Sequence, residues 1–264
     1  MNLKCPICHQ QLNKELKIYH CCNGHSFDIS KEGYVNLLNK QGHKQYGDSL
    51  EMIKARSLFL ASGYYQPLRM EILKVIKQYS ITNLVDSGCG EGYYTNYLKL
   101  NLPKVEVIGL DIAKRAIQYA RKEGKDVTYI VGSNQDIPIM DDNVDLILNC
   151  FAPIVQNEYY RILRPNGLLV TIQPGINHLL SLKQSVYDNV YLNEEKTNIS
   201  DFKQIYHQQL DFTLELNTTS DIIQLFQMTP YYQRTKQQDK QKLEQLTKLT
   251  TEAAFMINVY QKEQ

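Results

Sequence analysis

Cysteine and histidine side chains are concentrated at the start of this sequence. The four best-spaced candidates form two close pairs: Cys5, Cys8, Cys21 and His25. Two soft-ligand pairs separated by about a dozen residues are typical of tetrahedral zinc, with each pair on one tight turn. Other residues compete for the third and fourth places: His9, His20 and Cys22. We favour His25, because Gly24 beside it suits a sharp turn, and a closed site of this kind is structural.

A glycine-rich segment lies further along the chain, between an apolar run and a helical pattern. It reads Asp86-Ser87-Gly88-Cys89-Gly90-Glu91-Gly92. Glycines at such a turn let the backbone approach a ligand closely. The third glycine comes one residue earlier than in turns that bind a pyrophosphate. S-adenosylmethionine has no phosphate and carries a sulfonium and an ammonium, so an acid at the turn, Asp86 or Glu91, suits it electrostatically.

Two later segments complete this candidate cofactor site. Asp111 ends the next apolar run, where a carboxylate can accept hydrogen bonds from both ribose hydroxyls. Residues 132–138, which include Asp136, follow a third run and can read adenine through a side chain and a backbone amide. With an acidic turn at 141–149 and the segment 161–167, this ordered set resembles the class I methyltransferases. The resemblance implies a Rossmann-like sheet.

The elements that must position these residues alternate along the chain. We expect strands over 81–86, 105–111, 127–131, 144–150, 167–172 and 253–260, and helices over 93–102, 112–123 and 154–163. This order predicts an α/β fold with a parallel sheet covered by helices on both faces. We divide the chain into a zinc-binding module at 1–40, a helical linker at 41–78 and a methyltransferase domain at 79–264. The stretch around 176–235 breaks the pattern and is interpreted as an insertion or lid.

Composition limits the class of protein and its partners. No apolar run approaches the length of a membrane span, and no secretory signal precedes the cysteines, so we expect a cytoplasmic protein without a membrane partner. The net charge of +1 divides unevenly: residues 1–77 carry +5 and the remainder carries −4. A basic front half favours a polyanion partner. Candidate phosphate contacts are Lys31, Lys44, Lys54 and Arg56.

Several segments together resemble the bacterial 23S rRNA (guanine-N1)-methyltransferase family, nearly end to end. They are the zinc ligands and residues 27–38, 47–49, 52–56, 59–60, 63–68, 86–94, 175–179 and 227–230. The resemblance implies methyl transfer from S-adenosylmethionine to guanine N1 in a 23S rRNA hairpin loop, with zinc on the four residues chosen above. It also implies cofactor contacts from Tyr65, Gly90, Glu91 and His178, alongside Gly88 of the same turn. We include a homodimer among the expected assemblies.

The acceptor chemistry needs a base, because guanine N1 carries a proton. Asp48 and His178 are candidates, although the sequence places neither beside the acceptor. A base inside a hairpin must also turn outward, and Tyr231 or Tyr232 could stack on it. Cys150 suggests covalent pyrimidine methylation, but it lacks the neighbouring proline and is better interpreted as a buried thiol. Two other functions remain open: a small-molecule methyltransferase, and a non-catalytic RNA-binding protein that keeps the cofactor fold.

Overall fold

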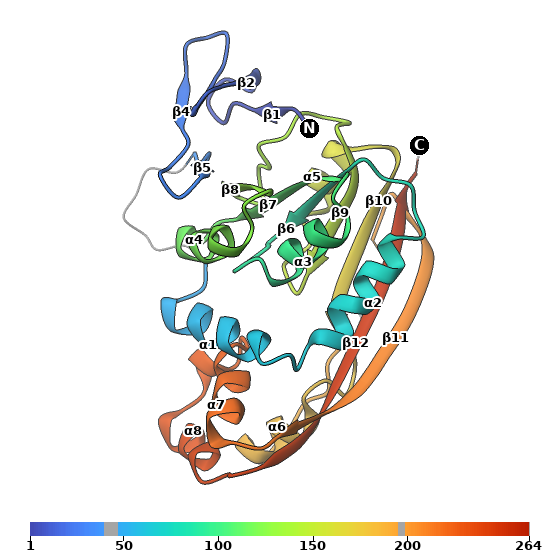
Figure 1. Ribbon diagram of the computed structural model, residues 1–264. Coiled ribbons are helices and arrows are strands. Elements are labelled where there is room, and N and C mark those ends of the chain that lie inside the picture. The colour runs from blue at the N-terminus through green and yellow to red at the C-terminus, as the bar shows by residue number, and fades with distance from the viewer. Residues whose placement is uncertain (40–46, 195–198, 264) are drawn as a thin grey trace.

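The computed structural model describes residues 1–39, 47–194 and 199–263 (Figure 1). The N-terminal part forms a small antiparallel sheet in the order β1-β2-β3-β4. Its strands are β1 (Leu3–Lys4), β2 (Gln11–Glu15), β3 (Ile18–His20) and β4 (Ser26–Asp28). So short a sheet buries little apolar surface of its own, and it depends on a metal and on the domain beneath it.

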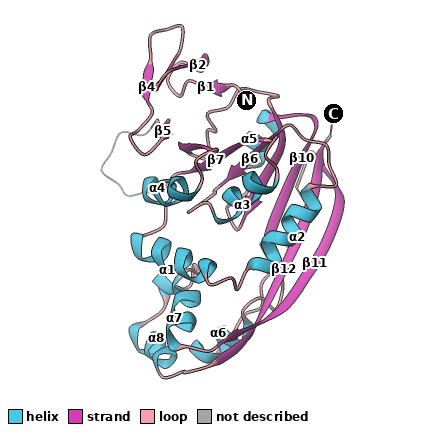
Figure 2. Ribbon diagram, viewed as in Figure 1, coloured by secondary structure: helices cyan, strands magenta, loops and turns pink. Residues whose placement is uncertain are grey.

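A larger sheet of eight strands forms the centre of the molecule (Figure 2). Its strand order is β11-β12-β10-β9-β6-β7-β8-β5. The strands are β5 (Tyr34–Asn36), β6 (Asn83–Ser87), β7 (Glu106–Asp111), β8 (Thr128–Val131), β9 (Val144–Cys150), β10 (Leu163–Pro174), β11 (Phe202–Leu216) and β12 (Leu249–Lys262). Strands β5 to β10 pair in parallel, whereas β12 and β11 are antiparallel. The central strands are buried along most of their length, and β8 and β9 are largely apolar, as expected for a sheet covered on both faces.

Helices lie beside this sheet and beyond its carboxyl edge. They are α1 (Leu50–Ala61), α2 (Gln66–Ile76), α3 (Tyr93–Asn101), α4 (Lys114–Glu123), α5 (Gln156–Ile162), α6 (Leu180–Val186), α7 (Thr219–Gln227) and α8 (Gln237–Glu244), with a 3-10 turn at Tyr232–Arg234. Helix α1 begins where the Ser49 hydroxyl accepts a hydrogen bond from the Met52 amide. None of the described helices is both long and apolar enough to cross a membrane.

The two faces of the large sheet are covered differently. Helices α2, α3 and α4 pack on one face, through side chains such as Ile72, Leu98 and Ile117. The other face is covered by α5 and by the N-terminal module, whose Leu3 and Leu12 are buried there. The module is therefore part of the domain's packing, and its strand β5 even extends the sheet beside β8.

The α/β fold is confirmed, and two details of the predicted arrangement are wrong. The sheet is mixed rather than parallel throughout. The stretch 176–235 is not simply an insertion, since it contains β11, which pairs with β12 from Phe202↔Lys262 to Leu216↔Leu249. The signal of this strand is an alternation of apolar with polar residues, which puts one face of β11 toward the core and the other toward solvent. The apolar members are Leu210, Phe212, Leu214 and Leu216.

Candidate zinc site and methyl-donor pocket

The four soft ligands of the N-terminal module lie together. Their ligand atoms are all within 4.8 Å of one another. Cys21 Sγ is 3.5 Å from Cys8 Sγ and 3.4 Å from His25 Nδ1. These separations match the edges of a tetrahedron whose centre is about 2.0–2.3 Å from each atom, the distance of zinc from nitrogen or thiolate sulfur. The site therefore fits Zn²⁺.

Backbone hydrogen bonds form the two turns that carry these ligands. The His9 amide donates to the Cys5 carbonyl, and the Cys21 amide donates to the His25 carbonyl. Gly24 closes the second turn with φ +81°, which favours glycine. The competing candidates are not part of this cluster. His20 faces Glu15, the exposed Cys22 thiol contacts Asn23, and His9 is not among the four grouped residues.

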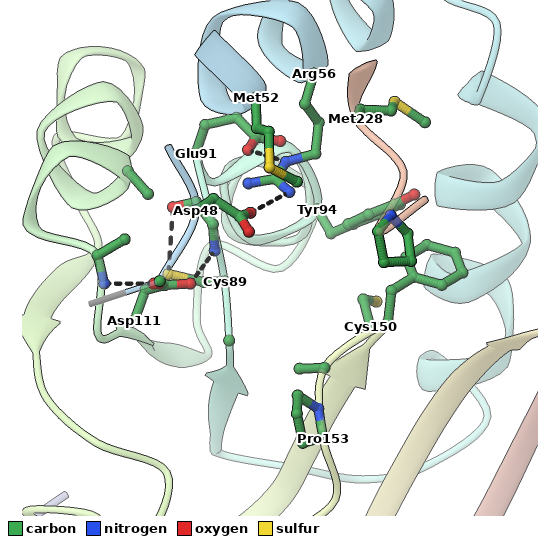
Figure 3. A pocket seen from close by; sticks show the side chains of 18 of the residues that line it. Asp48, Met52, Arg56, Cys89, Glu91, Tyr94, Asp111, Cys150, Pro153 and Met228 are labelled. Carbon is green, nitrogen blue, oxygen red and sulfur yellow. Dashed lines mark hydrogen bonds and ion pairs between the residues drawn. The ribbon is translucent and has the colours of Figure 1, made fainter. Parts of the chain in front are cut away.

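A cavity of about 690 Å³ opens at the carboxyl ends of β6, β7, β9 and β10 (Figure 3). Its volume is in the range of small-molecule sites. The lining residues come from the glycine-rich turn, helix α1, the loops after β7, β8 and β9, and the segments around His178 and 228–231. Ligand sites of open α/β sheets lie at this edge, where the strand order reverses.

The glycine-rich turn has the backbone that its sequence predicts. Gly88, Gly90 and Gly92 have φ values of +84°, +55° and +80°. A Cβ added to Gly88 would lie 2.6 Å from the Ala152 Cβ, so the loop after β9 packs directly on this turn. Any other residue at Gly88 would be strained and would push that loop away.

Two carboxylates, the buried Asp86 and the half-buried Asp111, face the cavity from neighbouring strands. Asp111 Oδ2 accepts a hydrogen bond from the Gly90 amide at 2.9 Å, and Oδ1 accepts one from the Ala113 amide at 2.7 Å. Asp86 Oδ2 accepts one from the Thr95 hydroxyl, while Oδ1 has no partner among the described residues. Burial raises the pKa of Asp86 to about 7 and also raises that of Asp111. A cationic ligand would satisfy the orphaned oxygen and favour the charged form.

Arg56 lies between two further carboxylates of the pocket. Its Nε donates to Glu91 and its Nη1 donates to Asp48, both at 2.6 Å (Figure 3). The expectation that Arg56 grips RNA phosphate is therefore wrong in this structure, because both sides of the guanidinium are engaged inside the pocket. Lys31 and Lys54 are exposed, and Lys44 lies outside the described residues.

An aromatic group lines the other end of the pocket. The Tyr65 hydroxyl is buried and has no hydrogen-bond partner among the described residues, and its ring centroid is 6.4 Å from that of His178. The Ala254 amide donates to His178 Nδ1. Burial, reinforced by the charge of Lys183, lowers the pKa of His178 to about 3. His178 is therefore neutral, with its proton on Nε2, and can donate a hydrogen bond from that atom.

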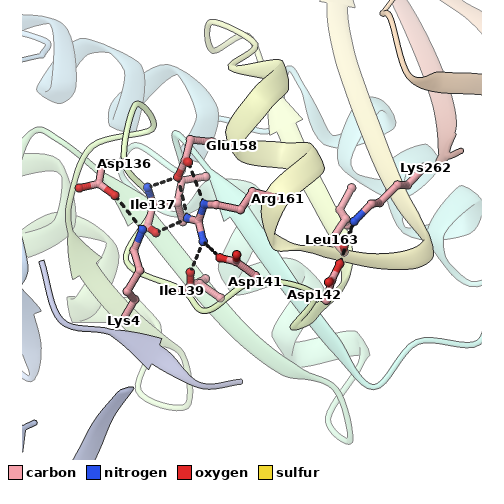
Figure 4. Close-up of polar contacts among 10 residues, drawn as sticks. All are labelled: Lys4, Asp136, Ile137, Ile139, Asp141, Asp142, Glu158, Arg161, Leu163 and Lys262. Atoms are coloured by element: carbon pink, nitrogen blue, oxygen red, sulfur yellow. Dashed lines mark hydrogen bonds and ion pairs between the residues drawn. The ribbon is translucent and has the colours of Figure 1, made fainter. Parts of the chain in front are cut away.

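Asp136 does not line the cavity, contrary to the sequence prediction. Its carboxylate lies 2.9 Å from Lys4 Nζ (Figure 4). Lys4 directly precedes the zinc ligand Cys5 in the sequence. A tight turn joins Ser133 to Asp136, and the Asp136 amide donates to the Ser133 carbonyl. The residues that face the cavity instead are Ser133, Asn134 and Gln135. Their place directly after an expected strand was the available signal.

Other residues also line the pocket, and Phe151 is one that the sequence did not single out. Met52 and Met228 line the cavity, and so do Tyr94 and Phe151. Tyr231 also lines it, whereas the Tyr232 hydroxyl donates to Glu51 outside. Cys150 is buried at the end of β9, and burial raises its thiol pKa, as expected for an inert thiol.

This sheet, its glycine-rich turn and the acid that ends β7 define a class I S-adenosylmethionine-dependent methyltransferase. A methyltransferase-domain family model matches residues 79–249, and the RlmA N-terminal zinc-ribbon model matches residues 3–45. A Bacillus subtilis protein provisionally named 23S rRNA (guanine-N1)-methyltransferase is 31% identical, over 70% of this chain and 68% of the relative. The chain belongs to this family.

A second relative agrees with this assignment, and a solved structure agrees with the fold. The 23S rRNA (guanine(748)-N1)-methyltransferase of Streptomyces fradiae is 32% identical over 68% of this chain and 66% of that protein. The solved structure of a Bacillus halodurans protein provisionally assigned as a methyltransferase superposes with a TM-score of 0.51 and 14% identity. It covers 74% of this chain and 99% of the other, and it shows the shared fold alone.

Proposed function

We propose that this protein transfers a methyl group from S-adenosylmethionine to N1 of a guanosine in a 23S rRNA hairpin loop. The observation that carries the proposal is one cavity that joins a glycine-rich turn, paired acids and an aromatic wall, in a chain that belongs to a family named for this activity. Asp86, Glu91 and Asp48 outnumber the single Arg56 around the turn, which suits a cationic methyl donor.

The donor's orientation follows from the groups around the turn. Asp111 would accept hydrogen bonds from the ribose hydroxyls, with Gly88 and Gly90 giving the backbone room to approach. Residues 133–135 would border the adenine, because they follow β8 on the far side of β7. The Tyr65 hydroxyl and the Nε2–H of His178 would donate hydrogen bonds to the methionine end of S-adenosylmethionine, because both groups lie in the pocket.

The bound donor supplies an electrophilic methyl group: its carbon–sulfur bond breaks as the carbon–N1 bond forms, and the electron pair returns to sulfur. The protein's task is to align guanine N1 with that methyl group and to exclude water. The N1 proton must leave to a base or to water. His178 is unsuited to take this proton, because its unprotonated nitrogen, Nδ1, already accepts a hydrogen bond from the Ala254 amide. Burial also lowers the pKa of His178 to about 3. Asp48 is available only if it is released from Arg56.

The zinc module is proposed to be structural, with Cys5, Cys8, Cys21 and His25 as ligands. Exposed lysines of the basic front half, Lys31 and Lys54, would contact RNA phosphates. The homodimer, the domain boundaries and the cytoplasmic location expected from the sequence stay predictions. Light scattering with and without RNA tests the first of these.

Mass mapping of methylated nucleotides in 23S rRNA, from cells with and without this gene, tests the function. We expect one N1-methylguanosine in a hairpin loop to disappear with the gene and to return when the purified protein and S-adenosylmethionine are added to the unmethylated rRNA. Methylation of small molecules but not of rRNA would support the small-molecule alternative. RNA binding without any methyl incorporation would support the non-catalytic one.

A further inference from the structure

Phe151 combines an unusual backbone with an unusual environment. It follows β9 and has φ +57°, a left-handed conformation that is uncommon for a bulky residue. Its side chain is 44% exposed although it lines the central cavity. The backbone is held there by a hydrogen bond from the Phe151 amide to the Ile172 carbonyl at 3.0 Å. Strained residues over-determined by their surroundings cluster at functional sites, and this one presents an aromatic ring to the cavity.

The ring contacts two other aromatic rings. Its centroid lies 5.7 Å from Phe255 and 6.5 Å from Tyr94, both in tilted arrangements. These contacts hold one part of the ring against the core, while 44% of the residue's surface remains exposed and the residue lines the pocket. An accessible, immobilised aromatic face is the feature that proteins use to stack an unpaired nucleobase.

The order of the strands separates Phe151 from the donor's adenine. The adenine side lies after β7 and β8, and the glycine-rich turn follows β6, while Phe151 follows β9 on the other side of β6. The Ala152 Cβ would lie 2.6 Å from a Cβ at Gly88, so this loop directly adjoins the turn that binds the donor. Phe151 is therefore close to the reacting end of the pocket and away from the adenine.

The charges of the pocket indicate what can occupy this end. Among the described lining residues, Arg56 is the one permanent cation, and Asp48 and Glu91 engage it. None of the described lining residues beside Phe151 would therefore neutralise a phosphate. Tyr94, Cys150 and Pro153 suit an uncharged planar ring.

We propose that Phe151 is the platform on which the acceptor guanine stacks after it leaves the RNA hairpin, so that N1 faces the methyl donor. This inference rests on the proposed function and adds a positioning residue to it. Phe151 thereby takes the role that the sequence suggested for Tyr231 or Tyr232.

The test compares methylation of a 23S rRNA hairpin by the full-length protein and by Phe151→Leu and Phe151→Tyr. Loss of base–aromatic stacking should lower kcat/KM for RNA about 5- to 150-fold in Phe151→Leu. Phe151→Tyr should restore most of it. The dissociation constant for S-adenosylmethionine, measured by calorimetry, should stay unchanged in both variants.

Phe212→Leu is the matched control, because Phe212 contacts the same Phe255 ring at 5.8 Å and does not line the pocket. Its kcat/KM should remain near that of the wild type at a similar melting temperature. Wild-type kinetics in Phe151→Leu, or a parallel loss of donor affinity, would overturn the stacking role. A wild-type protein that methylates no RNA would instead remove the proposed function and, with it, this inference.

Discussion

Lys4 Nζ lies 2.9 Å from Asp136 Oδ1, and this ion pair joins the zinc module to the loop beside the methyl-donor pocket. The Lys4 amide also donates to the Pro138 carbonyl, and Leu3 bridges Ile139. On the other side, the Arg161 guanidinium donates to the carbonyls of Ile137 and Ile139 (Figure 4). The loop that borders the expected adenine site is therefore held from both sides.

This connection gives the first prediction. Lys4→Met should retain zinc but weaken S-adenosylmethionine binding several-fold, because residues 133–135 lose one support; a part-exposed ion pair contributes about 0.5–1 kcal/mol. Asp136→Asn should have the same effect. In a double-mutant cycle measured by calorimetry, the combined variant should bind S-adenosylmethionine no more weakly than either single variant does. Additive losses would mean that the two side chains act separately.

Metal content gives the second prediction. The purified protein should contain about one zinc per chain, bound by three thiolates and one imidazole. Cys8→Ser should lose the metal and lower the melting temperature of the whole protein, since the module covers one face of the sheet. The matched control is Cys22→Ser, which changes an exposed thiol outside the cluster. Full zinc occupancy in Cys8→Ser, measured by mass spectrometry, would remove Cys8 from the ligand set.

Asp111 gives the third prediction. Its carboxylate is held by two backbone amides and would accept hydrogen bonds from the ribose. Asp111→Asn should weaken S-adenosylmethionine binding about tenfold to a hundredfold, because hydrogen bonds to a charged acceptor contribute about 1.5–3 kcal/mol. Calorimetry measures the loss. An unchanged dissociation constant would place the ribose elsewhere in the pocket.

The pH dependence of donor binding is the fourth prediction. Burial raises the pKa of Asp86 from its ordinary value of 3.8 to about 7. Between about pH 4 and 7 the native state then holds this proton more tightly than the unfolded state does, so Asp86 contributes less stability as the pH rises. Binding of a cationic donor requires the charged form. Affinity should therefore rise about tenfold from pH 6 to pH 8.

Asp86→Asn is the control for that profile. The variant should bind S-adenosylmethionine more weakly at pH 8 and show little change between pH 6 and pH 8, because the amide does not titrate. A wild-type profile that is already flat would show that another group balances the donor's charge.

Arg56 gives the fifth prediction, with Lys54 of the same helix as its exposed counterpart. Arg56→Gln should destabilise the protein by about 2–3 kcal/mol and weaken donor binding, since it leaves Asp48 and Glu91 without their shared cation. Its RNA affinity should keep the wild-type dependence on salt. Lys54→Gln should leave stability and donor binding unchanged. Its slope of log RNA affinity against log salt should be shallower by about 0.7–0.9. A shallower slope in Arg56→Gln would return that residue to the RNA surface.

The sequence by itself determined the features that depend on neighbours along the chain. Paired ligands on two tight turns indicated the zinc cluster, and the glycine-rich turn between a strand and a helix indicated the pocket. Asp111 could be chosen because an acid that ends the strand beside the turn must reach the same edge of the sheet. Spacing and strand order are enough for such residues.

The tertiary structure decided what depends on partners distant in sequence. Asp136 was assigned to the cofactor, but Lys4 attracts its carboxylate away from the pocket. Arg56 was predicted to contact RNA because it lies in the basic front half of the chain, whereas folding places it between Asp48 and Glu91. Phe151 carried no signal, because its exposure arises only where β9 ends against the glycine-rich turn. The sequence shows which side chains carry a charge or an aromatic ring. Their partners depend on tertiary packing, which brings together segments that no local sequence pattern connects.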